Sequence, residues 1–198
     1  MTRHAGTLPP SYFDKLYAAD LDPWQFETSD YERGKYAATL AALPRVRYAR
    51  VLEVGCSIGV LTRQLAERCD ALVSLDLAER ALDRARARCR DLAHVDLRLA
   101  QVPNDWPEGS FDLILLSEVV YYLDADDVER LVERVRGALA ASGDVGLVHW
   151  TGETHYPLTG DAAAEQFIDR GSTFLRVHSQ ARTDKYRLDV LRAREAQP

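Results

Sequence analysis

The fold of this chain is decided by one stretch of sequence, Val51-Leu52-Glu53-Val54-Gly55-Cys56-Ser57-Ile58-Gly59. Its apolar first half predicts a buried strand, and the glycines that follow predict a tight turn. A helical pattern comes next over residues 60–69, and a second apolar run over 71–75 ends at Asp76. Strand, glycine turn, helix, strand and terminal acid form the first half of a nucleotide-binding βαβ unit, in which the acid can accept the hydroxyls of a ribose.

The spacing of the glycines separates two classes of cofactor. A dinucleotide site requires the pattern G-x-G-x-x-G, which lets the backbone approach a pyrophosphate. Here Ser57 and Val60 occupy the second and third of those positions. The pattern that remains, Glu53-x-Gly55-x-x-x-Gly59, resembles that of class I S-adenosylmethionine-dependent methyltransferases, whose cofactor has no phosphate. A tight turn that binds no ligand is the alternative.

Composition bounds the class of protein. At 198 residues, with 46% hydrophobic and 28% charged residues, the chain is expected to form one domain with a full core. Its net charge of −6 argues against a nucleic-acid partner, because such partners are held by neutralising phosphates. No apolar stretch is long enough to span a membrane, and the N-terminus lacks the apolar core of a signal peptide. The 3 cysteines are odd in number and lack metal-ligand spacing, so we expect a reducing, cytoplasmic location and no metal site. Because no segment is suited to a bilayer, we expect no membrane partner either.

The rest of the chain continues the alternation of strands and helices. We expect a flexible tail over residues 1–10, a helical cap over 11–45 with helices at 12–19 and 29–42, and a methyltransferase domain over 46–198. Further strands are expected at 94–100, 111–117 and 144–150, helices at 79–90 and 126–141, and a closing pair of strands at 173–179 and 186–192. This order predicts an α/β, Rossmann-like fold: a mostly parallel twisted sheet with helices on both faces and a C-terminal β-hairpin.

The carboxyl ends of the strands are where ligands bind in an open α/β sheet, so the residues that follow each strand are candidates for a site. These segments are 55–59, 76–77, 101–102, 117–122 and 149–160. In methyl transfer from a sulfonium the donor is already activated, so the protein needs few catalytic groups. The nucleophile must be held near the methyl carbon, away from water, with a free lone pair. No single motif is therefore required, and the acceptor has to be inferred from its surroundings.

A narrower resemblance rests on three motifs. These are Asp22-Pro23-Trp24, Tyr31-Glu32-Arg33-x-Lys35 and Ser117-Glu118-Val119-Val120-Tyr121-Tyr122-Leu123. The third replaces the (Asp or Asn)-Pro-Pro-(Tyr or Phe) motif of methyltransferases that act on exocyclic amines of nucleic acids. Together the motifs resemble the nodulation protein S family over about residues 12–147. Members of that family N-methylate an amino group of a chitooligosaccharide precursor.

The resemblance implies a set of residues that bind S-adenosylmethionine. Asp76 takes the ribose hydroxyls, Leu77 packs on the adenine, and Gln101 and Val102 lie where the family holds the adenine. The family often has Asp at the position of Gln101, whose side-chain carbonyl can still accept a hydrogen bond from the adenine amino group. The full implied set is Gly55, Cys56, Ser57, Gly59, Asp76, Leu77, Gln101, Val102 and Ser117.

Three residues after the fourth and fifth strands are candidates for catalysis. Glu118 is interpreted as facing the methyl centre, where it stabilises a developing ammonium or accepts a proton; the alternative is a carboxylate that binds backbone N–H groups at a helix start. His149, at a strand end, is a candidate acceptor contact or general base, with loop polarity or a metal site with His155 as alternatives. Tyr122, with Tyr121, is a candidate wall for the sulfonium because aromatic rings attract cations, and one of the two is expected in the core.

These observations predict an S-adenosylmethionine-dependent methyltransferase that acts on a small polar acceptor. The family resemblance favours N-methylation of an amine, such as an amino sugar or a related metabolite. A small-molecule O-methyltransferase and a protein that binds S-adenosylmethionine without catalysis are the alternatives. The segment 149–161, after the fifth strand, is expected to form much of the acceptor wall.

Overall fold

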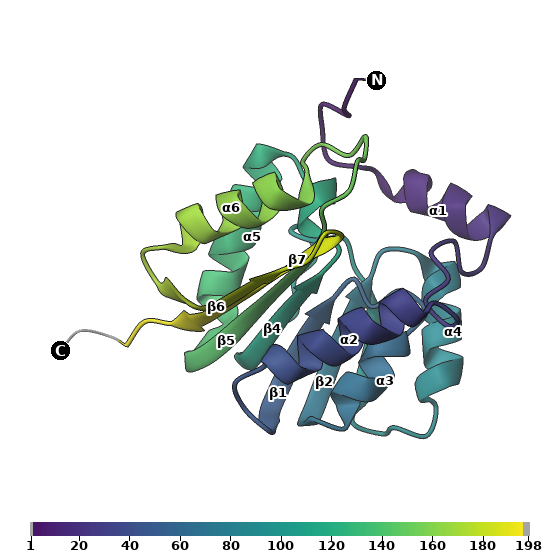
Figure 1. The fold of residues 1–198 in the computed structure, drawn as a ribbon. Coiled ribbons are helices and arrows are strands. Elements are labelled where there is room, and N and C mark those ends of the chain that lie inside the picture. The colour runs from purple at the N-terminus through teal and green to yellow at the C-terminus, as the bar shows by residue number, and fades with distance from the viewer. Residues whose placement is uncertain (1, 196–198) are drawn as a thin grey trace.

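A seven-stranded sheet forms the centre of the structure, a computed structural model that describes residues 2–195 (Figure 1). Its strands are β1 (Tyr48–Val54), β2 (Cys69–Asp76), β3 (Val95–Leu99), β4 (Phe111–Ser117), β5 (Leu139–Trp150), β6 (Leu175–Arg182) and β7 (Tyr186–Ala193). The helices are α1 (Pro10–Ala19), α2 (Asp30–Ala42), α3 (Val60–Ala66), α4 (Glu79–Cys89), α5 (Ala125–Ala138) and α6 (Gly160–Gly171), with a 3-10 turn η1 (Val120–Tyr122). The strands lie in the order β3-β2-β1-β4-β5-β7-β6.

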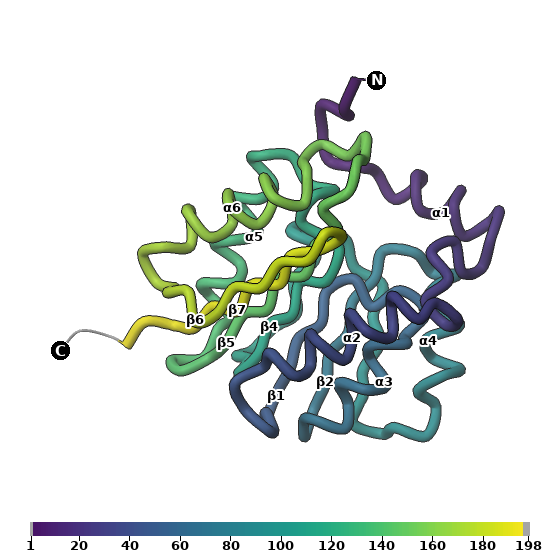
Figure 2. The backbone as a smooth tube through the Cα atoms, viewed as in Figure 1, coloured from purple at the N-terminus to yellow at the C-terminus, as the bar shows by residue number. Residues whose placement is uncertain are grey.

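The sheet is parallel from β3 to β5, and β7 is antiparallel to both of its neighbours. From β1 the chain proceeds to β2 and β3 and then returns to β4 on the other side of β1, so the strand order reverses between β1 and β4. The closing hairpin of β6 and β7 lies beside β5 (Figure 2). The predicted α/β fold, with its mostly parallel sheet and C-terminal hairpin, is confirmed.

Both faces of the sheet are covered, because neighbouring residues of a strand point to opposite sides. Val51 belongs to a buried cluster with Tyr36 of α2 and with residues of α3. The next residue, Leu52, belongs to another cluster with Leu131 of α5 and Phe167 of α6. Helices α2 and α3 therefore cover one face, and α5 and α6 cover the other (Figure 1). This burial on two sides explains why the central strands are nearly continuous apolar runs.

Three helices begin at polar residues that cap them. The side-chain oxygens of Ser29, Asp124 and Thr159 accept the backbone N–H three residues further on, at 3.3, 2.9 and 3.0 Å. These caps satisfy N–H groups that have no partner within the helix and so define where α2, α5 and α6 start. Helix α6 was not among the elements predicted from the sequence. None of the helices within residues 2–195 combines the length and apolar character needed to cross a bilayer.

Two predicted helices end earlier than expected because strand pairing takes over. Helix α5 stops before Leu139, which pairs with Phe111 of β4 and so lengthens β5 at its start. Helix α3 stops three residues short of Cys69, which pairs with Tyr48 and opens β2. At both places an apolar residue that fits the helical period is used by the sheet, where its backbone groups gain partners across the ladder.

The segment before α1 packs against the domain, which corrects the predicted flexible tail over residues 1–10, its first residue lying outside the described part. The backbone N–H of Leu8 donates to the carbonyl of Tyr122 at 2.9 Å, and the Leu8 side chain is 2% exposed. The Thr7 hydroxyl donates to the carboxylate of Asp127 at 2.6 Å. Anchored in this way, α1 lies across the carboxyl ends of the strands near α4 (Figure 1).

Gly59 allows α3 to pack closely on α4, a role different from the cofactor contact expected of it. Its φ is +78°, and a Cβ built on it would lie 2.9 Å from the Cα and Cβ of Ala85. We expect Gly59→Ala to lower the free energy of unfolding by about 2–5 kcal/mol, because the left-handed backbone costs roughly 1–2 kcal/mol and the overpacking roughly 1–3 kcal/mol.

Chemical denaturation measures this loss, and Gly137→Ala is its control. Gly137 lies in α5, and nothing is within 4 Å of its missing Cβ. That substitution is expected to leave stability unchanged or to raise it by about 0.5–1 kcal/mol. Equal stability of the two variants would show that position 59 has room for a side chain.

Candidate active site

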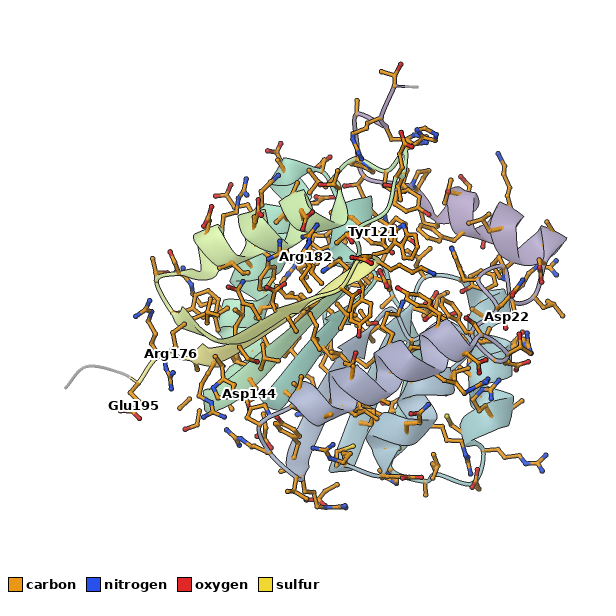
Figure 3. All side chains as sticks on the ribbon, viewed as in Figure 1. Asp22, Tyr121, Asp144, Arg176, Arg182 and Glu195 are labelled. Atoms are coloured by element: carbon orange, nitrogen blue, oxygen red, sulfur yellow. The ribbon has the colours of Figure 1, made fainter. Side chains whose placement is uncertain are left out.

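A cavity of about 440 Å³ lies at the carboxyl ends of β1, β2 and β4, where the strand order reverses. Helices α1 and α2 with the loop between them, the turn η1, and the segments after β3 and β5 form the rest of its wall. Tyr121, which also lines it, lies at the end of the molecule nearest α1, and Asp144 lies at the opposite end of the sheet (Figure 3). The predicted residues that line the cavity are Gly55, Ser57, Asp76, Leu77, Val102, Ser117, Glu118 and Tyr122.

The loop after β1 passes close to β4 because Gly55 has no side chain. Its φ is +87°, and a Cβ there would lie 2.7 Å from the carbonyl oxygen of Ser117 and would clash with the side chain of Val119. Its N–H donates to the carbonyl of Leu75 at 2.8 Å, which joins the ends of β1 and β2. Any larger residue at this position would push the loop away from β4 and change the shape of the cavity.

The carboxylate of Asp76 is fixed at the end of β2, where it lines the cavity. Its Oδ2 accepts the N–H of Ser57 at 2.8 Å, and its Oδ1 accepts the N–H of Ala78 at 2.9 Å. Burial raises the pKa of Asp76, and the backbone N–H groups act in the opposite direction. Because an ionised carboxylate has about four acceptor positions, about two remain for donors in the cavity, such as the hydroxyls of a ribose.

Ser57 joins the glycine loop to α1. Its backbone is left-handed, with φ of +48°, and its hydroxyl oxygen lies 2.5 Å from that of Tyr17. Burial, more than any charge nearby, raises the pKa of Tyr17, so its phenol stays protonated. This contact holds α1 at the edge of the cavity, which Phe13 and Tyr17 line together.

Glu118 follows β4 directly and is held by three contacts. Its Oε1 lies 2.5 Å from the Nζ of Lys35, and its Oε2 accepts the Tyr121 hydroxyl at 2.7 Å and the Trp150 N–H at 2.8 Å. Its φ of +57° is left-handed, a conformation that costs energy for a residue with a side chain. The side chain is 15% exposed, so the carboxylate is held by its neighbours and still reaches the cavity.

Lys35 of α2 is a site residue that the sequence analysis did not select. Its side chain is 3% exposed, and its Nζ lies 2.5 Å from Glu118 and 3.0 Å from Glu32. Burial lowers the pKa of Lys35, but the charges of the two carboxylates outweigh it and raise the pKa overall. The three side chains form an acidic cluster with one cation and two carboxylates. The signal in the sequence was the motif Tyr31-Glu32-Arg33-x-Lys35, which places the acid and the base one helical turn apart.

Aromatic rings form much of the remaining wall. Tyr121 and Tyr156 stack with their ring centroids 5.2 Å apart, and Tyr122 meets Tyr156 edge-on at 4.7 Å. Tyr31 of α2 meets Trp150 edge-on at 5.8 Å. Because aromatic faces attract cations, these rings and the acidic cluster together favour a positively charged ligand.

Three of the predicted cofactor residues do not line the cavity: Cys56, Gly59 and Gln101. Cys56 is 4% exposed and buried in the core. The backbone N–H of Gln101 donates to Asp105 at 2.9 Å, and the residues on either side of it line the cavity instead. Position after a strand therefore locates the segment, but neighbouring side chains point in different directions.

His149 is buried outside the cavity, which corrects its expected contact with an acceptor. Its side chain is 0% exposed, and its Nε2 accepts the backbone N–H of Val120 at 3.3 Å. Its ring packs edge-on against Tyr121 at 5.4 Å. Burial lowers the pKa of His149 to about 4, more than the neighbouring carboxylates raise it. A neutral imidazole in this position accepts the N–H of Val120 and so supports the turn after β4.

The neutral state of His149 predicts a pH dependence of stability. The unfolded chain takes up a proton on this residue near pH 6.5, whereas the folded chain does so only near pH 4. Stability from His149 is therefore present above about pH 6.5 and is lost as the pH falls, by about 3 kcal/mol in total. Glu53 has the opposite effect, since burial raises its pKa to about 7.

Urea denaturation of the wild type and of His149→Gln, at several pH values, isolates this contribution. The difference between their free energies of unfolding should shrink by about 3 kcal/mol on going from neutral pH to about pH 4. Because both proteins contain Glu53, its titration cancels in the difference. A difference that stays constant with pH would mean that His149 is solvated or charged in the folded chain.

Comparison with known proteins places the chain among methyltransferases. The family model for nodulation protein S (NodS) matches residues 12–145. Nodulation protein S of Rhizobium tropici is 37% identical over 128 residues, which are 64% of this chain and 53% of the relative. Nodulation protein S of Sinorhizobium fredii is 33% identical over 124 residues, which are 62% of this chain and 57% of the relative. The match thus spans about half the length of these curated relatives.

A solved structure shares the fold over nearly the whole chain. It is N-methyltransferase NodS from Bradyrhizobium japonicum WM9, in complex with S-adenosylhomocysteine. The TM-score is 0.79 at 23% identity, and the match covers 93% of this chain and 98% of that one. At this identity the likeness establishes the fold.

Proposed function

The chain belongs to the nodulation protein S (NodS) family, and on this premise we propose that it transfers a methyl group from S-adenosylmethionine to the nitrogen of a small amine. One observation carries the proposal: a single cavity combines a fixed carboxylate suited to a ribose, Asp76, with an acidic cluster suited to a cation, Glu118 with Glu32 and Lys35. Both lie at the strand ends where sheets of this kind bind ligands.

The residues around the glycine loop fit S-adenosylmethionine. Asp76 has acceptor positions left for the ribose hydroxyls, and Leu77 and Val102 offer apolar surface for an adenine ring. The absence of a side chain at Gly55 keeps the loop close to β4. When bound, this cofactor supplies a methyl group on a sulfonium whose sulfur leaves as a neutral thioether.

Glu118 is proposed to bind the acceptor and to take its proton. Three of its roughly four acceptor positions are used by protein donors, so about one remains for a ligand. An amine that enters as an ammonium donates an N–H to this oxygen. The N–H bond breaks, the proton passes to the carboxylate, and the electron pair stays on nitrogen as the lone pair that methyl transfer needs.

Nitrogen is favoured over oxygen as the acceptor by the charge of the wall. The acidic cluster and the aromatic rings attract an ammonium, whereas a carboxylate acceptor would be repelled. The solved relative is named an N-methyltransferase, which agrees with this choice. Within the amines, we propose an amino sugar or a related metabolite, since Trp150 and Tyr156 line the cavity and can stack on a sugar face.

Isothermal titration calorimetry tests the cofactor part of this proposal. S-adenosylhomocysteine should bind at one site per chain, and NAD should not bind, because the loop lacks the second and third glycines that a pyrophosphate needs. Binding of NAD without binding of S-adenosylhomocysteine would contradict the proposal. Binding without turnover on any acceptor would leave a protein that holds the cofactor without catalysis.

A further inference from the structure

A buried lysine in the acidic cluster has no part in cofactor binding as proposed above. Lys35 reaches from α2 across to Glu118, a residue 83 positions later in the chain, with 2.5 Å between Nζ and Oε1. Its second partner, Glu32, lies on its own helix at 3.0 Å. The three side chains are 3%, 8% and 15% exposed, so this contact is largely removed from solvent screening.

We infer that Lys35 is a positioning residue for Glu118: its ammonium fixes one carboxylate oxygen and keeps the group ionised and aimed at the acceptor. This inference rests on the proposed function, because it takes Glu118 as the group that receives the acceptor proton. Lys35 acts through Glu118 and needs no contact with the acceptor itself.

The charges of the cluster support this role. Without the cation, the largely buried carboxylates of Glu32 and Glu118 would lie near each other with no positive charge between them. Repulsion between two negative charges in such a place favours protonation of one of them. Burial already raises the pKa of Glu32. A protonated Glu118 could still accept a hydrogen bond but could not take the proton of an ammonium.

The tyrosines and the histidine around the cluster are uncharged near neutral pH. Burial raises the pKa of each tyrosine and lowers that of the histidine to about 4. These groups come from α2, η1, β5 and the segment after β5: Tyr31, Tyr36, Tyr121, Tyr122, His149 and Tyr156. Glu53 also titrates in the neutral range, because burial raises its pKa to about 7, but every protein compared below retains it. Differences between their pH profiles in this range therefore report on the acidic cluster and on the acceptor amine.

The competing interpretation is that the ion pair merely fastens α2 to the end of β4. The two roles differ in their pH dependence. If the ion pair only holds α2 against the end of β4, its loss lowers activity by the same factor at every pH at which the protein is folded. Loss of a cation that keeps Glu118 ionised lowers activity most at low pH, and the loss recedes as the pH rises.

Lys35→Met and Lys185→Met form a matched pair for the test. Both lysines lie over the ring of Tyr31, with Nζ 5.3 and 5.1 Å from its centroid, but Lys185 is exposed and does not line the cavity. We measure kcat and kcat/KM from about pH 6 to about pH 9 with an amine that the wild type methylates. Lys35→Met should lose roughly 10- to 100-fold in kcat near pH 7, with its acid limb moved to higher pH, and Lys185→Met should match the wild type.

The double variant Lys35→Met/Glu32→Gln separates charge from position and guards against misfolding. It removes one positive and one negative group, so the cluster keeps the charge it has in the wild type. Its acid limb should return to that of the wild type, whereas its kcat should stay low because Oε1 of Glu118 is no longer held. Melting temperature and affinity for S-adenosylhomocysteine establish that each variant is folded.

The outcomes distinguish this inference from the proposed function. If Lys35→Met keeps the acid limb of the wild type, or loses no activity, the inference about Lys35 fails although the protein is still an amine methyltransferase. If the wild type methylates no amine at any pH, the proposed function fails and the role of Lys35 fails with it.

Discussion

Replacing Glu118 with glutamine is expected to lower the turnover of an amine by roughly 10²–10⁴-fold, the usual contribution of a general base. The amide has nearly the same shape but cannot take a proton, and it loses the charge-assisted contact with Lys35. Its carbonyl oxygen can still accept the N–H of Trp150, so the turn after β4 should keep its shape. The affinity for S-adenosylhomocysteine should stay within about threefold of the wild type.

Mass spectrometry of the methylated product, at saturating cofactor and acceptor, measures this loss. Glu129→Gln is the matched control, because Glu129 is exposed on α5 and does not line the cavity. Tyr121→Phe should have a smaller effect, since it removes only the hydroxyl contact at 2.7 Å. A Glu118→Gln protein that turns over within a few-fold of the wild type would reduce Glu118 to a structural carboxylate.

Asp76→Ala is expected to weaken S-adenosylhomocysteine binding by about 3–6 kcal/mol, or roughly 10²–10⁴-fold. The reason is that two hydroxyls of the ribose lose a charged acceptor, and each such hydrogen bond contributes about 1.5–3 kcal/mol. The N–H groups of Ser57 and Ala78 lose the same acceptor, which loosens the glycine loop as well. Asp76→Asn, which keeps the shape and one acceptor oxygen, should show an intermediate loss.

Calorimetry measures the affinities, and Asp70→Ala is the control. Asp70 lies on the same strand at its other end, where it is exposed and pairs with Arg47 at 2.6 Å. Its removal should leave binding unchanged. If Asp76→Ala binds S-adenosylhomocysteine as the wild type does, the ribose lies elsewhere and the proposed orientation of the cofactor is wrong.

The central strands could be predicted from the sequence because their chemistry is local. The nearly continuous apolar run over 111–117 coincides with β4, since a strand buried on both faces needs apolar residues at nearly every position. Helix α6 was missed because it begins at Gly160, directly after a stretch with Gly152 and Pro157 that is typical of a loop. The end of α5 was misplaced because Leu139 fits the helical period and the pairing with β4 alike.

Some residues of the candidate site could also be predicted from the sequence, and others could not. Asp76 and Glu118 could be found because the carboxyl ends of parallel strands meet at one edge of the sheet. His149 also lies near the end of a strand, but its side chain is buried in the core. Successive side chains of a strand point to opposite faces, and the sequence of that strand does not show which face His149 takes. Lys35 precedes the sheet altogether. Its contact with Glu118 depends on how α2 packs, which is a property of the whole fold.

Methylation of an amine is tested most directly by a product screen with the purified protein. S-adenosylmethionine is supplied with amino sugars, other amines, phenols and carboxylates, and products are identified by mass spectrometry over a range of pH. The structure predicts methyl transfer to an amine nitrogen, at a rate that rises with pH until the bound amine is neutral. Efficient methylation of a phenol or a carboxylate, with every amine ignored, would contradict the assignment of the acidic cluster to an ammonium.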